Sequence, residues 1–264
     1  MINPNVITRI SQTEGIGWEV VEKDYFLTLM LEGIAQTPAL VRNLVFKGGT
    51  CLRKAYFEDY RYSEDLDFTL RKPMDGKALR EALDNALDYL KREHNASLGI
   101  KGFNSKSYFT DAKVRFSGLR ESKGVISLDI SGDEPIVDLA AERAVFNPYY
   151  SGKISVPAYS LEEILAEKLR SLLQRTRVRD YYDVWYLLGS GRVGMARARQ
   201  IFLKKAAFKK IRFIGPEQFL VAENIGQARA YYEAQVKNQV KELPPFETIM
   251  DGLKDSIRLM WANE

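Results

Sequence analysis

The sequence is poor in the two residues that build most thiol and imidazole chemistry. It contains one cysteine, Cys51, and one histidine, His94, among 264 residues. A single cysteine forms no internal disulfide, the pair supplies no zinc-finger spacing, and any nucleophile activated by histidine would have to use His94. Catalysis is therefore expected to depend on carboxylates, lysines, arginines and hydroxyl groups.

Long apolar runs are missing as well. The first 15 residues lack an apolar core of signal-peptide length, and the most apolar stretch, residues 25–31, is interrupted by Thr28 and followed by Glu32. We therefore expect a cytoplasmic protein without a membrane contact. The formal net charge of +4 is too small for a general polycation, although a local basic face could still bind nucleic acid.

Hydrophobic periodicity predicts an α+β fold with two lobes. Alternating or short apolar runs bounded by turn residues predict strands at 44–47, 65–70, 108–116 and 124–131. Helical spacing predicts helices at 18–35, after Asp75, and, beyond the capping box of Ser160 and Glu163, at 160–174, 180–188, 194–208, 217–236 and 246–261. The predicted domains are a catalytic lobe at 1–157, with a mixed sheet flanked by helices, and a helical lobe at 158–264.

Three aspartates in the first lobe are candidate metal ligands. Asp65 and Asp67 alternate with apolar residues on a predicted strand, so both side chains project from one face. Carboxylates so close together repel each other unless a cation lies between them, and Mg²⁺ is their preferred partner beside phosphates. Asp129 would join them if its strand is a neighbour, and three carboxylates could frame two Mg²⁺ ions. Asp133 and Asp138 are alternatives for the third position.

A glycine pair lies between the first predicted strand and a short helix. Gly48 and Gly49 have no Cβ atoms, so the backbone can approach a nucleoside triphosphate, and the helix that follows directs its N–H groups at the anion. The spacing differs from that of a Walker loop. The predicted nucleotide-binding residues of this region are Lys47, Gly48, Gly49, Thr50, Arg53 and Ser63.

The order of these motifs resembles the DNA polymerase β type of nucleotidyltransferase superfamily. More narrowly, the chain resembles the AbiEii/AbiGii toxin family in the segments FKGGTCLRK, RYSEDLDF, EEILAEKL and RVRDYYDVW, together with VEKDY near the N-terminus. The resemblance spans at least residues 22–186. The gap between Gly49 and Asp65 is a few residues longer than the superfamily pattern, and this insertion, with Arg61 and Ser63, matches the toxin family.

The resemblance implies a nucleotidyltransferase fold and a toxin that is paired with an antitoxin. It also implies transfer of a nucleoside monophosphate from an NTP to the 3′ end of tRNA, with release of diphosphate. In this family the residues that match Lys168 and Asp183 belong to the active site. Lys168 is then a triphosphate ligand, Asp183 its orienter or a base near the acceptor, and Asp129 helps to deprotonate the attacking hydroxyl. From the residues alone, a salt bridge between two helices explains Lys168 and Asp183 equally well.

Basic residues are concentrated in one segment of the second lobe. Residues 168–212 contain 13 lysines and arginines and two aspartates, Asp180 and Asp183, a balance of +11, which leaves 4 − 11 = −7 for the rest of the chain. Such a segment suits a polyanion such as RNA, although a solvated helix surface is the common alternative. The predicted RNA-binding residues are Arg175, Arg177, Arg179, Lys204, Lys205, Lys209 and Lys210.

Two other functions agree with the same residues. The catalytic lobe could transfer a nucleotide to a small molecule or to a protein hydroxyl, in which case the basic segment would have no RNA to bind. Alternatively, the protein could bind a nucleotide or RNA without catalysis. Intact Asp65, Asp67 and Lys168 favour an enzyme, because a binding module has no chemical reason to keep like charges together.

Overall fold

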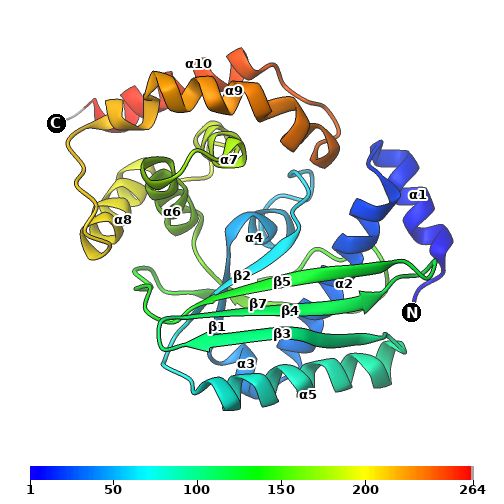
Figure 1. The fold of residues 1–264 in the computed structure, drawn as a ribbon. Helices are drawn as coiled ribbons and strands as arrows, with labels where there is room; N and C mark the ends of the chain where they lie inside the picture. The colour runs from blue at the N-terminus through cyan, green and yellow to red at the C-terminus, as the bar shows by residue number, and fades with distance from the viewer. Residues whose placement is uncertain (263–264) are drawn as a thin grey trace. The chain divides into compact units, whose positions relative to one another are not determined.

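The computed structural model describes residues 1–262 (Figure 1). The chain divides into two compact units, Met1–Tyr159 and Ser160–Glu264. The first combines a mixed sheet with helices and the second is helical, which confirms the α+β fold predicted from the sequence. None of the helices in residues 1–262 has both the length and the apolarity that a membrane span requires.

The first unit is built on a mixed sheet, which has seven strands within residues 1–159. Their order across the sheet is β3-β4-β5-β2-β1-β7-β6, with β2–β5 and β1–β7 parallel and the other pairs antiparallel. The strands are β1 (Leu44–Lys47), β2 (Asp65–Leu70), β3 (Leu98–Lys106), β4 (Phe109–Ser117), β5 (Lys123–Ser131), β6 (Ala141–Ala144) and β7 (Ser155–Ala158).

Four of these strands follow the predicted pattern, whereas β3, β6 and β7 were not predicted. Strand β3 contains Gly99 and Gly102, β6 is exposed along its whole length, and β7 contains Pro157. Glycine and proline weaken a strand signal, and an exposed strand has no apolar alternation to detect. Pairing with neighbours in the sheet decides these three strands.

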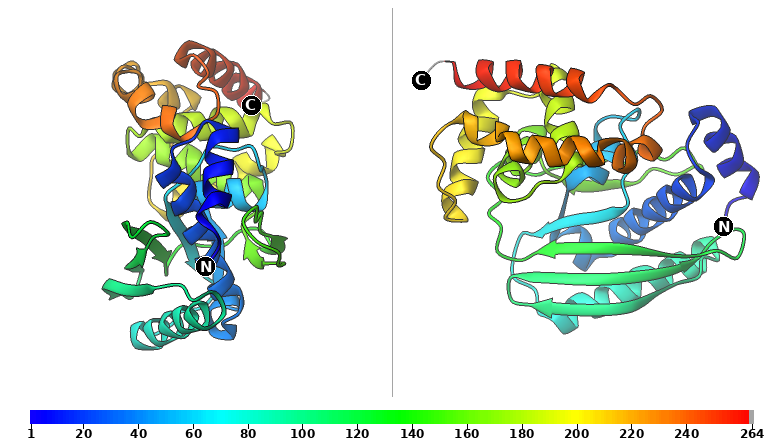
Figure 2. Two further views of the ribbon diagram at one scale, coloured as in Figure 1. Left: turned by 90° about the vertical axis from the view of Figure 1, so that its right-hand side faces the viewer. Right: turned by 45° about the horizontal axis from the view of Figure 1, so that its top comes forward.

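Helices cover one face of the β3–β4–β5 part of the sheet (Figures 1 and 2). The helices of this unit are α1 (Pro4–Glu14), α2 (Trp18–Ala35), α3 (Pro38–Val41), α4 (Gly48–Ala55) and α5 (Gly76–His94). Phe116 of β4 stacks on Phe26 of α2 with ring centroids 4.1 Å apart. Ile126, Leu128 and Ile130 of β5 are buried, while the residues between them are not, so the other face of β5 remains accessible.

The second unit contains only helices within residues 160–262. They are α6 (Leu161–Gln174), α7 (Val178–Gly189), α8 (Met195–Phe208), α9 (Ala222–Val236) and α10 (Phe246–Trp261), with 3₁₀ turns η1 (Pro216–Leu220) and η2 (Lys237–Gln239). Ser160 caps α6 as predicted, because its hydroxyl accepts a hydrogen bond from the Glu163 N–H at 3.1 Å. The single helix predicted for 217–236 is divided into η1 and α9 at Val221.

Candidate active site

The predicted carboxylates lie together on one face of two neighbouring strands. Parallel pairing of β2 with β5 places Asp67 opposite Asp129 and Asp65 opposite Ser127. Paired residues of adjacent strands project from the same face, so the three aspartates share the face opposite buried Leu66. The alternatives Asp133 and Asp138 lie beyond Ser131, where β5 ends.

The chemistry of these aspartates suits a hard divalent cation. Within residues 1–262, no group of three or more His, Cys, Asp or Glu side chains is arranged to hold a metal ion by itself. Mg²⁺ is commonly bound by one or two carboxylates, with water and substrate phosphates completing the shell. Asp67 and Asp129, paired across two strands, fit that type of binding.

The glycine turn packs directly on this acidic pair. Gly48 begins α4 with φ at +80°, and a Cβ atom added there would lie 2.9 Å from Cγ of Asp67. A Cβ atom on Gly49 would lie 3.0 Å from Nη2 of Arg61 and 3.2 Å from Oγ of Ser63. The positive φ and the contact with Asp67 require glycine at position 48, and a side chain at position 49 would press on the polar ends of Arg61 and Ser63.

The other predicted nucleotide ligands of this unit already make contacts inside it. Lys47 is the register partner of Asp67, and its Nζ donates to Oγ of Ser131 at 3.4 Å. The Thr50 hydroxyl donates a hydrogen bond to the carbonyl of Asp65, which ties α4 to β2. Lys47 thus bridges the strands beside the acidic pair, and Thr50 supports the turn from behind.

The burial of Arg53 disagrees with its predicted role as a nucleotide-binding residue. Its side chain is 2% exposed and stacks on the ring of Tyr62, with 3.7 Å between Cζ and the ring centroid. Nη1 donates to the carbonyls of Glu58 at 3.0 Å and Tyr60 at 2.6 Å. The guanidinium therefore holds the loop before β2 and has no exposed face to offer to a nucleotide, so we assign Arg53 a positioning role.

The VEKDY segment of α2 supplies two buried acids whose roles the sequence patterns did not reveal. Asp24 accepts hydrogen bonds from Nζ of Lys54 at 2.5 Å and from the Tyr149 hydroxyl at 2.6 Å. Burial alone would raise the pKa of Asp24, but Lys54 and Arg53 lower it below its ordinary value. Since Lys54 lies on α4, Asp24 anchors the helix that follows the glycine turn.

Glu22, the other acid of this segment, anchors the connection between β4 and β5. Its carboxylate accepts hydrogen bonds from the backbone N–H of Leu119 at 2.5 Å and from the Ser122 hydroxyl at 2.8 Å. The signal for both residues was available in the sequence: acidic side chains inside a helix that is otherwise strongly apolar are expected to have buried partners. The segment thus fixes α4 and the hairpin that leads to Asp129.

In the second unit, Lys168 pairs with both aspartates of α7. Its Nζ lies 2.9 Å from Oδ1 of Asp180 and 2.7 Å from Oδ2 of Asp183, and the lysine side chain is 13% exposed. Nε of Arg175 also contacts Asp180 at 3.0 Å. Burial tends to raise the pKa of Asp180, but Lys168 and Arg175 lower it overall. The salt bridge considered from the sequence is present, and Asp180 shares in it.

Lys205 was predicted to bind RNA, but its burial excludes that role. Lys205 is fully buried, with Nζ 2.9 Å from Oε1 of Glu163 and 2.8 Å from Oε1 of Glu167. The two glutamates raise the pKa of Lys205 despite the opposing effect of burial. The Lys205 ammonium is neutralised by these two glutamates inside the second unit and is inaccessible to RNA. The remaining predicted residues are exposed or half-buried: Arg175, Arg177, Arg179, Lys204, Lys209 and Lys210.

Two solved structures have the same fold as this chain. MenT4, a nucleotidyltransferase toxin from Mycobacterium tuberculosis H37Rv, matches with a TM-score of 0.74 and 18% identity, covering 100% of this chain and 91% of that chain. A candidate nucleotidyltransferase from H. pylori matches with a TM-score of 0.61 and 17% identity, covering 93% and 96%. The fold is therefore that of nucleotidyltransferases.

The family follows from the sequence itself. Residues 30–252 match the family model described as nucleotidyl transferase AbiEii toxin of type IV toxin–antitoxin systems. The chain belongs to this family of nucleotidyltransferase toxins. No curated protein matches it.

Proposed function

We propose that this toxin is a Mg²⁺-dependent enzyme that transfers a nucleoside monophosphate from an NTP to the 3′ end of tRNA. The observation that carries the proposal is the contact of the Gly48 backbone with Asp67, which itself lies opposite Asp129. A turn that admits phosphates thereby adjoins carboxylates that suit the accompanying cation. A basic segment in the second unit supports a nucleic-acid acceptor.

The reaction divides between the turn and the acidic strands. The triphosphate lies over Gly48 and Gly49. Asp67 and Asp129 would hold Mg²⁺ together with water and phosphate oxygens, with Asp65 as the remaining predicted ligand on the same face, and the ion would supply positive charge beside the phosphates. The acceptor 3′ oxygen forms a bond to the α-phosphorus, the bond from that phosphorus to the bridging oxygen breaks, and diphosphate leaves. Asp129 accepts the proton of the attacking hydroxyl.

In this proposal the second unit supplies positively charged side chains that bind the triphosphate and the RNA. Lys168, held by Asp180 and Asp183, acts as a ligand of the outer phosphates. Asp183 thereby acts as the orienter of Lys168. The remaining predicted RNA-binding residues contact the acceptor RNA by their charge: Arg175, Arg177, Arg179, Lys204, Lys209 and Lys210. A cognate antitoxin is the expected partner, as the type IV toxin–antitoxin family indicates, and the cytoplasm is the expected location.

A labelling experiment tests the proposal. The purified protein is incubated with total tRNA and each α-labelled NTP in turn, with Mg²⁺ or with EDTA. Label in the tRNA band that needs Mg²⁺ is expected, and Asp67→Asn should reduce it at least a hundredfold. The control Asp88→Asn removes the same charge from an exposed position of α5 and should remain fully active.

Other outcomes point to the other functions. Label on protein or on a small molecule, with none on tRNA, would contradict the tRNA acceptor while keeping the site. NTP binding without transfer to any acceptor would support a binding module. Label that persists on tRNA in Asp67→Asn would contradict the assignment of the acidic strands.

A further inference from the structure

The accessible face of strands β3, β4 and β5 carries a line of cations beside the candidate active site. We call Lys101, Lys113, Arg115 and Lys123 the basic sheet face. Antiparallel pairing of β4 with β5 places Lys113 opposite Ser127, Arg115 opposite Val125, and Ser117 opposite Lys123. Ser127, Val125 and Lys123 alternate with buried residues in step with Asp129. The cations of β4 and β5 therefore project from the same face as the candidate catalytic carboxylate.

This line of cations leads away from Asp129. A strand rises about 3.3 Å per residue, so the level of Lys113 lies roughly 7 Å from that of Asp129, the level of Arg115 roughly 13 Å, and Lys123 roughly 20 Å. Helices α2 and α5 pack against the opposite face of these strands (Figure 1). The distance of roughly 20 Å between the levels of Asp129 and Lys123 equals the length of several nucleotides along one nucleic-acid strand.

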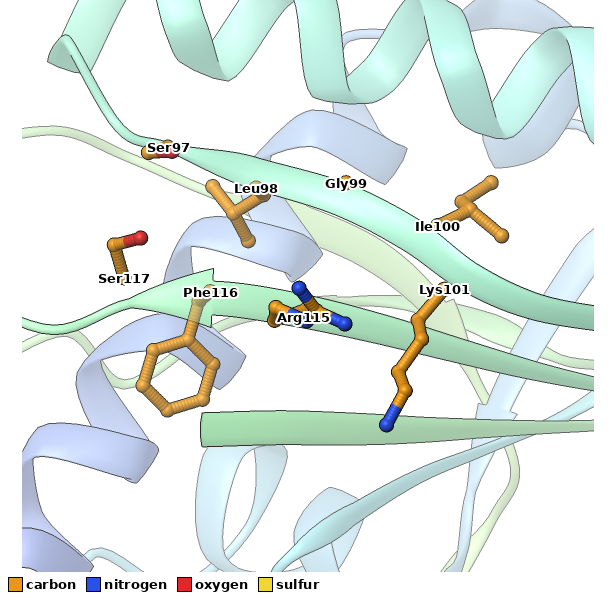
Figure 3. A pocket seen from close by; sticks show the side chains of 8 residues that line it. All are labelled: Ser97, Leu98, Gly99, Ile100, Lys101, Arg115, Phe116 and Ser117. Carbon is orange, nitrogen blue, oxygen red and sulfur yellow. The ribbon is translucent and has the colours of Figure 1, made fainter. Parts of the chain in front are cut away.

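The outer part of the basic sheet face borders a hollow of about 500 Å³ on β3 and β4 (Figure 3). Lys101 and Arg115 line it from neighbouring strands; the other lining residues are Ser97, Leu98, Gly99, Ile100, Phe116 and Ser117. The lysine, arginine and serine side chains and the open glycine backbone suit phosphate oxygens.

The charges of the outer part are available to a ligand. In residues 1–262, Lys113 forms an ion pair with Asp111 at 3.1 Å, whereas Lys101, Arg115 and Lys123 form none and are exposed. Cations that have no internal carboxylate partner keep their full attraction for an external polyanion.

We propose that the basic sheet face binds the phosphate backbone of the acceptor RNA and directs its 3′ hydroxyl to Asp129. This inference rests on the proposed function, and it adds a second RNA-contacting surface in the first unit, distinct from the basic segment 168–212. Charge complementarity and continuity with the acidic strands select RNA as the occupant. A small-molecule acceptor would not reach a line of cations roughly 20 Å long.

Two charge-matched double variants test the proposal. Arg115→Gln/Lys123→Gln removes two cations from the basic sheet face, and Lys91→Gln/Arg92→Gln removes two exposed cations from α5, which packs on the opposite face. All four positions are exposed, so both variants should fold, which circular dichroism verifies. Each protein is titrated against fluorescent tRNA at several KCl concentrations, without NTP.

If the basic sheet face binds RNA, the two double variants should differ in their affinity for tRNA. Arg115→Gln/Lys123→Gln should bind tRNA at least tenfold more weakly, and the slope of log affinity against log salt should fall by roughly 1.4 to 1.8, since each lost phosphate contact accounts for about 0.7 to 0.9. In the transfer assay its KM for tRNA should rise by the same factor, while its KM for NTP stays unchanged. Lys91→Gln/Arg92→Gln should match the wild type within twofold.

The outcomes separate this inference from the proposed function. An unchanged salt slope in Arg115→Gln/Lys123→Gln, or an equal loss in both variants, overturns the basic sheet face, as does a wild type that does not bind tRNA. A variant that keeps tRNA binding but no longer binds an acidic antitoxin also overturns it and assigns the face to a protein partner. Wild-type binding that depends on the face, without transfer of label to tRNA, supports the inference and contradicts the proposed function.

Discussion

Replacement of Asp24 by asparagine tests how strongly α2 holds the glycine turn. The substitution keeps the shape of the side chain and removes its charge. Asp24 is buried, as is the Lys54 ammonium that it contacts at 2.5 Å, and Nε of Arg53 lies 3.7 Å from its other oxygen. Lys54 then loses its carboxylate and Arg53 keeps only Glu14, which lies 3.5 Å from Nη2, while the Tyr149 hydroxyl can still donate to the amide oxygen.

The expected destabilisation is large. Removal of one partner from a buried ion pair costs about 3–5 kcal/mol, because the remaining charge stays away from water without compensation. A typical protein has a free energy of unfolding of about 5–15 kcal/mol, so Asp24→Asn removes a considerable part of it. Replacing both partners with neutral groups is far milder, so Asp24→Asn/Lys54→Met should be more stable than Asp24→Asn alone.

Urea denaturation followed by circular dichroism measures these differences. Burial lowers the pKa of Lys54 below its ordinary value. Without Asp24 that pKa falls further, so unfolded Asp24→Asn binds more protons than the folded form, and its stability should rise with pH until about 10.4. The reasoning is refuted if Asp24→Asn lies within 1 kcal/mol of the wild type, or if the double variant loses the sum of both single effects.

Three further predictions follow from the structure. Lys205→Met should lose about 3–5 kcal/mol of unfolding free energy in urea, because two carboxylates lose their cation, whereas Lys204→Met at the exposed neighbouring position should change it by no more than about 0.5 kcal/mol. The pKa of Asp180 is lowered in the folded protein, so its ionised carboxylate stabilises the fold above about pH 4, and this effect is lost as pH falls through the folded value. The free energy of unfolding of Asp180→Asn, measured from pH 6 to pH 3, should therefore fall less with decreasing pH than that of the wild type. Gly48→Ala should abolish nucleotide transfer and cost at least about 1–2 kcal/mol, because φ is +80° and the new methyl group collides with Asp67, whereas Gly226→Ala, in open space on α9, should raise stability by about 0.5–1 kcal/mol.

Local patterns in the sequence predicted much of the fold and the common face of two candidate site residues, Asp65 and Asp67. Asp75 caps α5 as expected, accepting hydrogen bonds from the N–H groups of Lys77 and Ala78, and Ser160 caps α6. The alternation of Asp65 and Asp67 with apolar residues gave their common face. These features depend on residues within a few positions of one another, so the period of the chain and the capping chemistry are sufficient to predict them.

Contacts between distant segments were decided by the tertiary structure alone. Asp129 lies opposite Asp67 because β2 and β5 pair in parallel, although α5, β3 and β4 separate them along the chain. The burial of Arg53 and Lys205 against acids on other elements could not be read from charge counts, which treat every basic residue as exposed.

The sequence by itself thus determined which residues are chemically capable: the glycine pair, the acidic strand and the surplus of basic residues. Only the tertiary structure decided which of them act together. Periodicity and capping are local properties, whereas strand pairing and the burial of a charge depend on elements that are far apart in the chain and meet only when it folds.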